Sequence, residues 1–399
     1  MKRLLAAICC MGLLAPSAKA GGAGTTAASF LKIDPSAREA ALAGAVTALT
    51  DDSPALINYN PALIAAADYK QLSFTHTGWL SGVQLESLSY AHPHKKTLTF
   101  GAGINYLHTP DVPKTDASGN PLGSSFNSAD GVFSLGVANR FHENIFAGAS
   151  FKTIRQSMDD RNATAFAGDA GLLVRYEAVA LGLAVSNFGS ELKLYEQESP
   201  LPLTYKAGLS VKAGENFTLL GEADKPSDTV PIIRAALEYS AYGVLVPSDR
   251  YSLRLGYRTS TAESAGPGFT IGAGMRLKRF SLDYCFVPMG DLGNTNRISI
   301  SVGFGATRAE QLAQASAQKP VAHGSMVPPK PVKRRKAAVV APEDSVLDDA
   351  YKPRLKDPHT YLLEDESSGG PQSPDAAFSA QDRARTRIPR KSSTSPVVE

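Results

Sequence analysis

The amino-acid sequence predicts an all-β protein: a fourteen-stranded antiparallel transmembrane β-barrel with a short helical N-terminal hatch and a disordered C-terminal tail. Three observations support this prediction. From residue 69 to residue 305, apolar residues alternate with polar or small ones, segment after segment. The non-apolar positions are mostly Gly, Ala and Ser, and short links between segments largely alternate with long ones. A period of two over about ten residues is typical of a strand with two unlike faces.

The segment that begins at Thr97 illustrates the alternation. One of its faces carries Leu98, Phe100, Ala102, Ile104 and Tyr106. The other face carries only Thr, Gly and Asn. Small residues suit the inside of a barrel, while bulky apolar residues suit contact with acyl chains. A soluble sandwich or barrel remains the alternative, although its outer face would carry longer polar side chains.

The alternating segments number fourteen, and an even count is expected of a single-chain bacterial barrel. They cover residues 69–78, 82–92, 96–109, 129–141, 144–156, 163–175, 178–188, 203–213, 216–225, 231–241, 249–259, 267–277, 280–287 and 296–305. With both barrel ends in the periplasm, the outward loops begin near Gly78, Pro110, Ser157, Gly189, Pro226, Ser260 and Pro288. The 242–248 link is long for a periplasmic turn and is the weakest part of this register.

Residues 1–20 are predicted to be a secretory signal peptide. A basic start at Met1–Arg3 precedes the apolar stretch Leu4–Leu14, and Ala18–Ala20 gives the small-residue cleavage pattern. A short buried helix is the alternative. After residue 20 no apolar stretch is long enough for a transmembrane helix, so we expect strands to cross the bacterial outer membrane.

Two segments flank the predicted barrel, residues 69–305. Residues 21–68 contain an Ala-rich helical pattern over residues 36–50 and a second helical start at Pro54, which predicts a hatch that plugs the lumen. A periplasmic cap outside the pore is the alternative. Residues 306–399 are rich in Pro, Ser and charge, which predicts a disordered periplasmic tail. Its basic run over residues 328–336 is either simply solvated or a contact with an anionic surface such as the cell wall.

Composition and motifs exclude several classes of function. The formal net charge of +3 over 399 residues argues against a dedicated nucleic-acid binder, which would carry a strongly basic domain. No nucleophile, phosphate-binding or zinc motif is present, so we expect no catalytic residue, no cofactor, no metal and no enzymatic activity. Removal of the leader would leave Cys285 as the only cysteine, and hence no internal disulfide.

The inward faces of the last six predicted strands carry charge. The inward positions are Glu222, Asp224, Arg234, Glu238, Arg254, Arg258, Arg276, Asp283 and Arg297. We expect Glu238 to pair with Arg254, and Asp283 with Arg276 or Arg297, because a buried charge is costly unless it is paired. Structural ion pairs are the favoured interpretation. Such a lumen also disfavours a hydrophobic ligand, which requires a mainly apolar pocket.

Two motifs at the ends of the barrel region resemble the PorV/PorQ outer-membrane family. The hatch motif contains Asp51, Asp52, Asn58, Asn60 and Pro61, and the last-loop motif is Gly290, Asp291, Leu292, Gly293 and Asn294. The resemblance covers about residues 24–305 and implies a fourteen-stranded barrel similar to the fatty-acid transporter FadL, with an N-terminal hatch. Family members usually stop near the last strand, whose terminal aromatic here is Phe304, and some serve the type IX secretion system.

Three functional hypotheses follow. The resemblance favours a secretion-associated barrel that binds or shuttles exported proteins, with secretion components as partners. A FadL-like transporter of small hydrophobic molecules is the alternative. The third hypothesis is a structural scaffold whose tail contacts periplasmic partners. All three place the protein in outer-membrane lipid and exclude nucleic acid as a partner.

Overall fold

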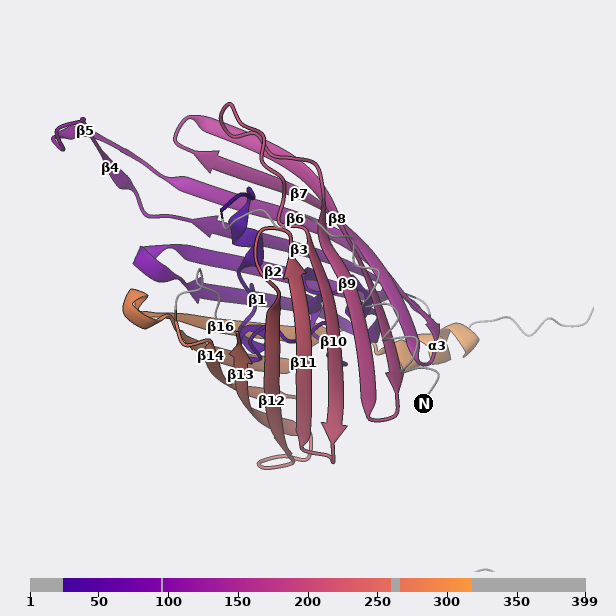
Figure 1. Cartoon of the computed structure of the whole chain (residues 1–399). Coiled ribbons are helices and arrows are strands. Elements are labelled where there is room, and N and C mark those ends of the chain that lie inside the picture. Colours follow the sequence, from indigo (N-terminus) through magenta and orange to yellow (C-terminus); the bar gives the residue numbers. More distant parts are fainter. Residues whose placement is uncertain (1–23, 95, 260–265, 318–399) are drawn as a thin grey trace, which may run out of the picture. The chain divides into compact units, whose positions relative to one another are not determined.

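The computed structural model describes residues 24–94, 96–259 and 266–317 (Figure 1). The predicted signal peptide, residues 1–20, and the predicted tail from residue 318 onward lie outside the described residues. No helix within the described ranges is long and apolar enough to cross a membrane.

Fourteen strands close into one antiparallel barrel, which confirms the predicted fold class. Neighbours in the barrel follow the chain, except that β3 pairs with β6, and β1 pairs with β16 to close the ring. The strands are β1 (Lys70–Gly78), β2 (Gln84–His94), β3 (Leu98–His108), β6 (Ser128–His142), β7 (Ile145–Met158), β8 (Arg161–Tyr176), β9 (Val179–Gly189), β10 (Thr204–Ala213), β11 (Phe217–Pro226), β12 (Ile232–Tyr242), β13 (Asp249–Arg258), β14 (Phe269–Leu277), β15 (Phe280–Pro288) and β16 (Asn294–Phe304).

The strands have the two unlike faces that the alternation predicted. On β13, Leu253 and Leu255 face outward and are 63% and 55% exposed, whereas Arg254 between them is 2% exposed. Leu209 of β10 and Ile271 of β14 face outward in the same way. The outside of the barrel is therefore apolar, and its polar and small side chains face the lumen.

A hairpin that the sequence did not predict extends from the link between β3 and β6. Strands β4 (Val112–Thr115) and β5 (Pro121–Phe126) pair only with each other (Figure 1). The Asp116 carboxylate accepts hydrogen bonds from the backbone N–H groups of Ser118 (2.9 Å) and Asn120 (2.8 Å), which closes the turn. Side chains on both faces of β4 and β5 are exposed, so no buried face requires apolar residues at every second position.

The long link between β12 and β13 is a compact turn. The Asp249 carboxylate accepts hydrogen bonds from the backbone N–H groups of Val244 (2.8 Å), Leu245 (2.7 Å) and Val246 (2.9 Å). The backbone N–H groups of the additional residues are therefore hydrogen-bonded within the turn. The inward and outward positions of β12 and β13 remain as the sequence predicted.

Residues 24–68 lie inside the barrel, and we call them the hatch (Figure 1). The hatch contains the helix α2 (Ala37–Ala41) and the 3₁₀ helices η1 (Ser29–Lys32), η2 (Pro54–Asn58) and η3 (Pro61–Ala66). The helix predicted over residues 36–50 is therefore wrong beyond Ala41. Ala43 and Gly44 have left-handed φ values of 52° and 76°, which end the helix, since contacts with the barrel wall outweigh the helix propensity of alanine.

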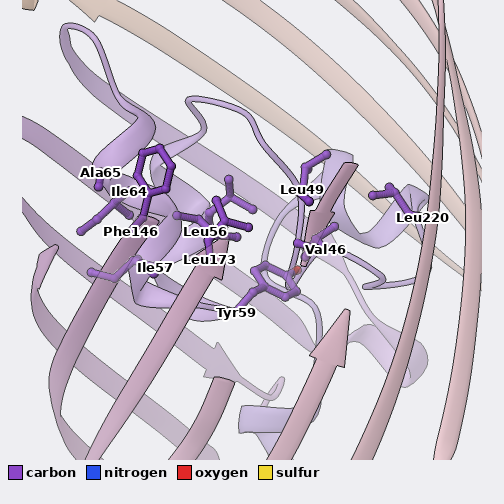
Figure 2. Packing of buried hydrophobic residues seen from close by; sticks show 14 of the residues in the cluster. Val46, Leu49, Leu56, Ile57, Tyr59, Ile64, Ala65, Phe146, Leu173 and Leu220 are labelled. Carbon is purple, nitrogen blue, oxygen red and sulfur yellow. The ribbon is translucent and has the colours of Figure 1, made fainter. Parts of the chain in front are cut away.

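The main apolar core lies between the hatch and the wall. Leu56, Ile57 and Ile64 of the hatch belong to one buried cluster with Phe146 of β7 and Leu173 of β8 (Figure 2). Figure 2 shows these side chains gathered on the inner side of the strands. The hydrophobic stabilisation of this barrel interior thus comes from hatch–wall contacts, in addition to the strand ladder.

Glycines on the inward faces allow the hatch backbone to approach the wall closely. A Cβ atom on Gly148 of β7 would lie 2.6 Å from the carbonyl of Pro61, and one on Gly182 of β9 would overlap the carbonyl of Thr47. Real Cβ atoms do not come so close, so these two positions require glycine. The close approach of the hatch backbone thus explains why the inward faces of these strands carry small residues.

The barrel unit extends beyond residue 305, which corrects the predicted start of the tail. Helix α3 covers Arg308–Ala317, and Arg308 is 5% exposed. Its guanidinium donates hydrogen bonds to the carbonyls of Lys96 (2.9 Å) and Ala67 (2.8 Å) and to Thr99 Oγ1 (2.8 Å). Arg308 therefore joins the end of the hatch to the turn between β2 and β3.

We predict that Leu209→Arg destabilises the barrel in vesicles by about 2–4 kcal/mol, because it places a charge on the lipid-facing surface. The free energy of unfolding in urea, followed by heat-modifiable gel migration, measures the cost. Leu122→Arg on the exposed β4–β5 hairpin is the control and should be neutral. Equal effects of the two substitutions would show that Leu209 does not face lipid.

A second prediction concerns the approach of the hatch to β14. A Cβ atom on Gly272 would overlap Ala41 and lie 2.7 Å from the carbonyl of Tyr284. We expect Gly272→Ala to displace α2 and to reduce its stability by about 1–3 kcal/mol, seen as faster amide hydrogen exchange in Ala37–Ala41. Gly221→Ala is the control, since nothing lies within 4 Å of its Cβ position. Unchanged exchange in Gly272→Ala would contradict this packing.

Candidate functional site

A network of buried ion pairs joins the hatch to the wall, and we call it the hatch ion network. Arg38 of α2 lies between two carboxylates, with its Nη2 2.6 Å from Asp51 Oδ2 and 3.0 Å from Glu238 Oε1. Arg254 Nε lies 2.6 Å from Glu238 Oε2, and Arg254 Nη1 lies 2.8 Å from Asp283 Oδ1. One continuous chain of charge therefore runs from the hatch through β12 and β13 to β15.

Asp51 and Asp52 extend the network to β13 and β14. Arg276 Nη1 lies 2.7 Å from Asp52 Oδ1, and Arg250 Nη1 lies 3.5 Å from Asp51 Oδ2. Burial alone would raise the pKa of Asp51, but Arg38, Arg250 and Arg276 together hold it well below its usual range. Burial and the neighbouring Asp51 charge raise the pKa of Asp52 instead. Asp51 is thus the anion around which the guanidinium groups gather.

The structure contains the expected ion pair of Glu238 with Arg254 but differs from the sequence prediction at Asp283. Asp283 pairs with Arg254 and not with Arg276 or Arg297. Gly274 on the intervening strand β14 leaves room for this contact, since a Cβ atom there would overlap both Asp283 and Arg254. The prediction considered neighbouring strands only and could not include a bridge across a glycine.

Arg297 of β16 has no carboxylate within 4 Å among the described residues. Its Nε donates to the backbone carbonyl of Asp34 (3.1 Å), and its Nη1 donates to Thr295 Oγ1 (3.2 Å). Its guanidinium carbon lies 5.3 Å from the centre of the Trp79 ring. Arg297 therefore holds the hatch through backbone and ring contacts.

Asn60 and Pro61 of the hatch motif shape the hatch itself. The Asn60 Oδ1 atom accepts a hydrogen bond from the backbone N–H of Ala62 (3.0 Å), which caps η3, and Pro61 occupies the first turn of this helix. The Asn60 Nδ2 atom donates to the carbonyls of Thr47 (2.9 Å) and Leu172 (3.3 Å). Asn60 thereby links two parts of the hatch to β8.

Asn58, the remaining member of the hatch motif, connects the hatch to β3. Its Nδ2 atom donates to the carbonyl of Ala55 (3.1 Å), and its Oδ1 atom accepts from Asn105 Nδ2 (3.0 Å). The structure therefore brings the hatch motif and the lumen charges together in one interior.

The last-loop motif and Phe304 lie apart from that interior. Gly290, Asp291 and Leu292 form the short helix η5, and Gly293, with a φ of 98°, turns the chain into β16 at Asn294. Leu292 is 61% exposed. Phe304 faces outward and stacks on Tyr90 of β2, with ring centres 6.3 Å apart. These residues belong to the rim and the outer wall.

A cavity of about 390 Å³ lies between the hatch and the wall. Its lining includes Trp79, Thr229, Thr259 and Met289, each of which follows a strand at the barrel end where the outward loops are predicted. No member of the hatch ion network lines the cavity. The lumen therefore contains two separate charged regions.

Six cationic side chains line this cavity, namely Lys32, Lys152, Lys206, Arg234, Arg258 and Arg297. Three of them have a close carboxylate partner: Lys32 with Asp228 (2.6 Å), Lys152 with Asp169 (2.7 Å) and Arg234 with Asp224 (2.7 Å). The other three have no carboxylate within 4 Å among the residues that the structure describes. The cavity therefore differs from the hatch ion network, in which every guanidinium has an acidic partner.

Two hydroxyl groups in the cavity lining also lack hydrogen-bond partners among the described residues, Tyr59 Oη and Ser186 Oγ. Tyr59 is 4% exposed, and Lys206 Nζ lies 5.6 Å from the centre of its ring. Burial, with Asp34 and Glu39 nearby, raises the pKa of Tyr59 well above its usual value. Tyr59 is therefore a neutral hydrogen-bond donor at physiological pH.

Sequence reasoning identified Arg234, Arg258 and Arg297 as inward but missed the cavity itself. Lys152 and Lys206 occupy inward positions of their strands, so the same alternation could have identified them. Lys32 and Tyr59 belong to the hatch, where no periodicity indicates which side chains reach the cavity. Among the described residues, no group of three or more His, Cys, Asp or Glu side chains is arranged to hold a metal.

The fold and the site together define a class of protein: a closed fourteen-stranded barrel with an internal N-terminal hatch and a charged cavity beside it. In sequence, residues 14–158 match an uncharacterised protein family, UPF0164. No curated protein matches the chain.

Several solved structures resemble this barrel at low identity. The CymD monoaromatic hydrocarbon channel is 11% identical, with a TM-score of 0.49, and the match covers 68% of this chain and 98% of that chain. A FadL homologue from Pseudomonas aeruginosa is 10% identical (TM-score 0.46; 68% and 98% covered), and the Pseudomonas putida toluene transporter TodX is 12% identical (TM-score 0.44; 70% and 96% covered). These likenesses concern barrel architecture alone.

We predict that Asp51→Asn loosens the hatch by about 3 kcal/mol, because it leaves the buried Arg38 with one acidic partner instead of two. Faster amide hydrogen exchange in α2 would report this loss. Asp116→Asn in the exposed β4–β5 turn is the control and should leave α2 unchanged. Because the pKa of Asp51 is depressed, this carboxylate stabilises the hatch fully above about pH 4, and the stabilisation is lost as the pH falls further. Asp51→Asn should therefore make the stability of the hatch less dependent on acidic pH. An unaltered α2 in Asp51→Asn would contradict a structural role for the network.

Proposed function

We propose that this chain is a FadL-like outer-membrane barrel that takes up a small solute through its lumen, with the hatch as the movable barrier. The observation that carries the proposal is the cavity between hatch and wall, whose lining contains cations and hydroxyl groups without close partners. An interior that served only to stabilise the barrel would give such cations close acidic partners, as the hatch ion network does for its guanidinium groups.

The outer surface supports a location in lipid. Large apolar side chains such as Phe166 (51% exposed), Leu253 (63%) and Ile271 (53%) are exposed on strands around the barrel. Soluble proteins rarely expose apolar patches of more than a few hundred Å². Outer-membrane barrels carry such a band on the face that meets the acyl chains.

The hatch is held by contacts that can be broken and formed again. Ion pairs, hydrogen bonds and apolar packing attach it to the wall, and its covalent connection to the barrel is the chain leading into β1. Movement of residues 37–66 away from the wall would open the lumen without unfolding the strand ladder. This arrangement fits a gated channel better than an open pore.

A hydrophobic solute is the less favoured cargo. The named channels with a similar barrel carry monoaromatic hydrocarbons or toluene, but the cavity here has six cations in its lining. Pockets for apolar ligands are lined mainly by apolar groups with few polar ones. The lining of this cavity therefore disfavours a hydrophobic solute.

A secretion-associated role is the second candidate. It rests on the resemblance of the hatch and last-loop motifs to the PorV/PorQ family. The exposed Leu292 of the last loop and the exposed β4–β5 hairpin would supply a surface for an exported protein. A scaffold role would depend on the tail and its periplasmic partners.

A disulfide between the hatch and the wall tests the channel proposal. A Cβ atom on Gly208 of β10 would lie 3.2 Å from Thr47 Cβ, a few tenths of an ångström below the range of about 3.5–4.5 Å for disulfides, so a small shift of the hatch would allow the bond. In vesicles that contain Thr47→Cys/Gly208→Cys, we expect small-solute uptake to be blocked when the pair is oxidised and restored by reduction. The two single-cysteine variants are the controls. Uptake that does not depend on the redox state would rule out passage past the hatch and favour the secretion-associated role.

A further inference from the structure

We propose that the cavity binds a small hydrophilic oxyanion, a carboxylate or a phosphate, held by Lys206 and Arg258 with Tyr59 as a neutral donor. This inference rests on the proposed function, since it names the class of solute that the same lumen would take. Nothing in the sequence motifs assigns such a ligand.

Charge is the first argument. Six cationic side chains line the cavity, whereas the carboxylates in its lining or paired with those cations are Asp34, Asp169, Asp224 and Asp228. Glu222 of β11 lies nearby, and it accepts a hydrogen bond from the backbone N–H of Thr47 (2.7 Å). With Glu222 and the nearby Glu39 of the hatch also counted, the described acids equal the six cations in number. None of these acids lies within 4 Å of Lys206 or Arg258, so an oxyanion would give these two cations the close partner that they lack.

Donor geometry is the second argument. Lys206 and Arg258 have no carboxylate within 4 Å among the described residues, and Tyr59 Oη and Ser186 Oγ have no hydrogen-bond partner there. Lys206 Nζ already lies 5.6 Å from the centre of the Tyr59 ring, so this ammonium and this ring occupy the same part of the cavity. Ammonium, guanidinium and hydroxyl groups all donate, and charge-assisted bonds to an oxyanion are the strong ones.

The neighbouring groups leave Lys206 and Arg258 without a close ion pair, although Asp224 lies opposite Lys206 in the strand ladder and Asp34 lies near Arg258. Arg234 donates to the carbonyl of Ala43 (2.5 Å) and pairs with Asp224, while Arg297 donates to the carbonyl of Asp34. Both guanidinium groups thus hold the hatch in place. Lys206 and Arg258 make no such contact with the hatch backbone among the described residues, which leaves their charges available to a solute.

Size is the third argument. A volume of about 390 Å³ lies at the lower end of the range for small-molecule sites, and it suits a compact solute. The hatch closes one side of this space, and the strand ends at the loop side form the other. A small acid such as succinate, or inorganic phosphate, fits both this volume and the charge of the lining.

The single tryptophan provides a direct test. Trp79 is the only tryptophan of the chain, it lines the cavity, and its ring centre lies 5.3 Å from the Arg297 guanidinium carbon. The full-length protein in detergent is titrated with succinate, with inorganic phosphate and with toluene at constant ionic strength set by sodium chloride. Tryptophan emission and calorimetric heat are both recorded. We expect saturable binding of succinate, phosphate or both. The titration that reaches saturation shows whether the site takes a carboxylate or a phosphate.

Variants on one strand supply the matched control. Lys206→Gln and Arg258→Gln should each weaken oxyanion binding about tenfold or more, since each removes a charge-assisted contact. Lys212→Gln removes a cation from the same inward face of β10 but outside the cavity, and it should bind as the unaltered protein does. Heat-modifiable migration confirms that each variant is folded.

Three outcomes would overturn the inference: no saturable signal with either oxyanion by either method, saturation by toluene alone, or unchanged affinity in folded Lys206→Gln and Arg258→Gln. The failure of the inference and that of the channel proposal remain distinguishable. Redox-dependent uptake without oxyanion binding would leave the channel intact and reject the ligand class. Oxyanion binding without redox-dependent uptake would retain the site and reject transport.

Discussion

The contact of Arg38 with Asp51 and Glu238 is the interaction on which the interior of this barrel depends. A fourteen-stranded barrel is wider than its own side chains can fill, so a separate segment must occupy the lumen. The charges that line such a lumen must also find partners once water is displaced. Arg38 meets both requirements, because it belongs to the segment that fills the space and joins the acids of the hatch to those of the wall.

The steric design of the strands follows from the same requirement. The hatch backbone comes into direct contact with the strand backbone at inward glycines such as Gly148 and Gly182. The outward residues of the same strands are large and apolar. The same strands therefore provide two packing surfaces: small inward residues pack against the hatch, and large apolar outward residues face lipid. The main apolar core consequently lies between the hatch and the wall.

The lumen contains one region in which every guanidinium is paired and another in which three cations have no close acidic partner among the described residues. In the hatch ion network every guanidinium has a carboxylate partner, and that region is best understood as an attachment of the hatch. In the cavity, Lys206 and Arg258 have no carboxylate partner within 4 Å, and the hydroxyl groups of Tyr59 and Ser186 have no hydrogen-bond partner, among the described residues. Stability accounts for the first region, whereas binding of a solute is the simpler explanation of the second.

The number, order and facing of the barrel strands could be predicted from the sequence, because a period of two and the alternation of short and long links are local properties of the chain. The sequence also marked Glu238, Arg254 and Arg276 as lumen residues, since inward orientation follows from register. The path of the hatch could not be predicted in this way, because contacts with the wall, which form only in the folded chain, end its helix at Ala41. The tertiary structure also decided which charges meet, since the bridge from Arg254 to Asp283 depends on the space above a glycine of a third strand. The cavity is formed by side chains from the hatch and from distant strands, and no local pattern in the chain encodes their meeting.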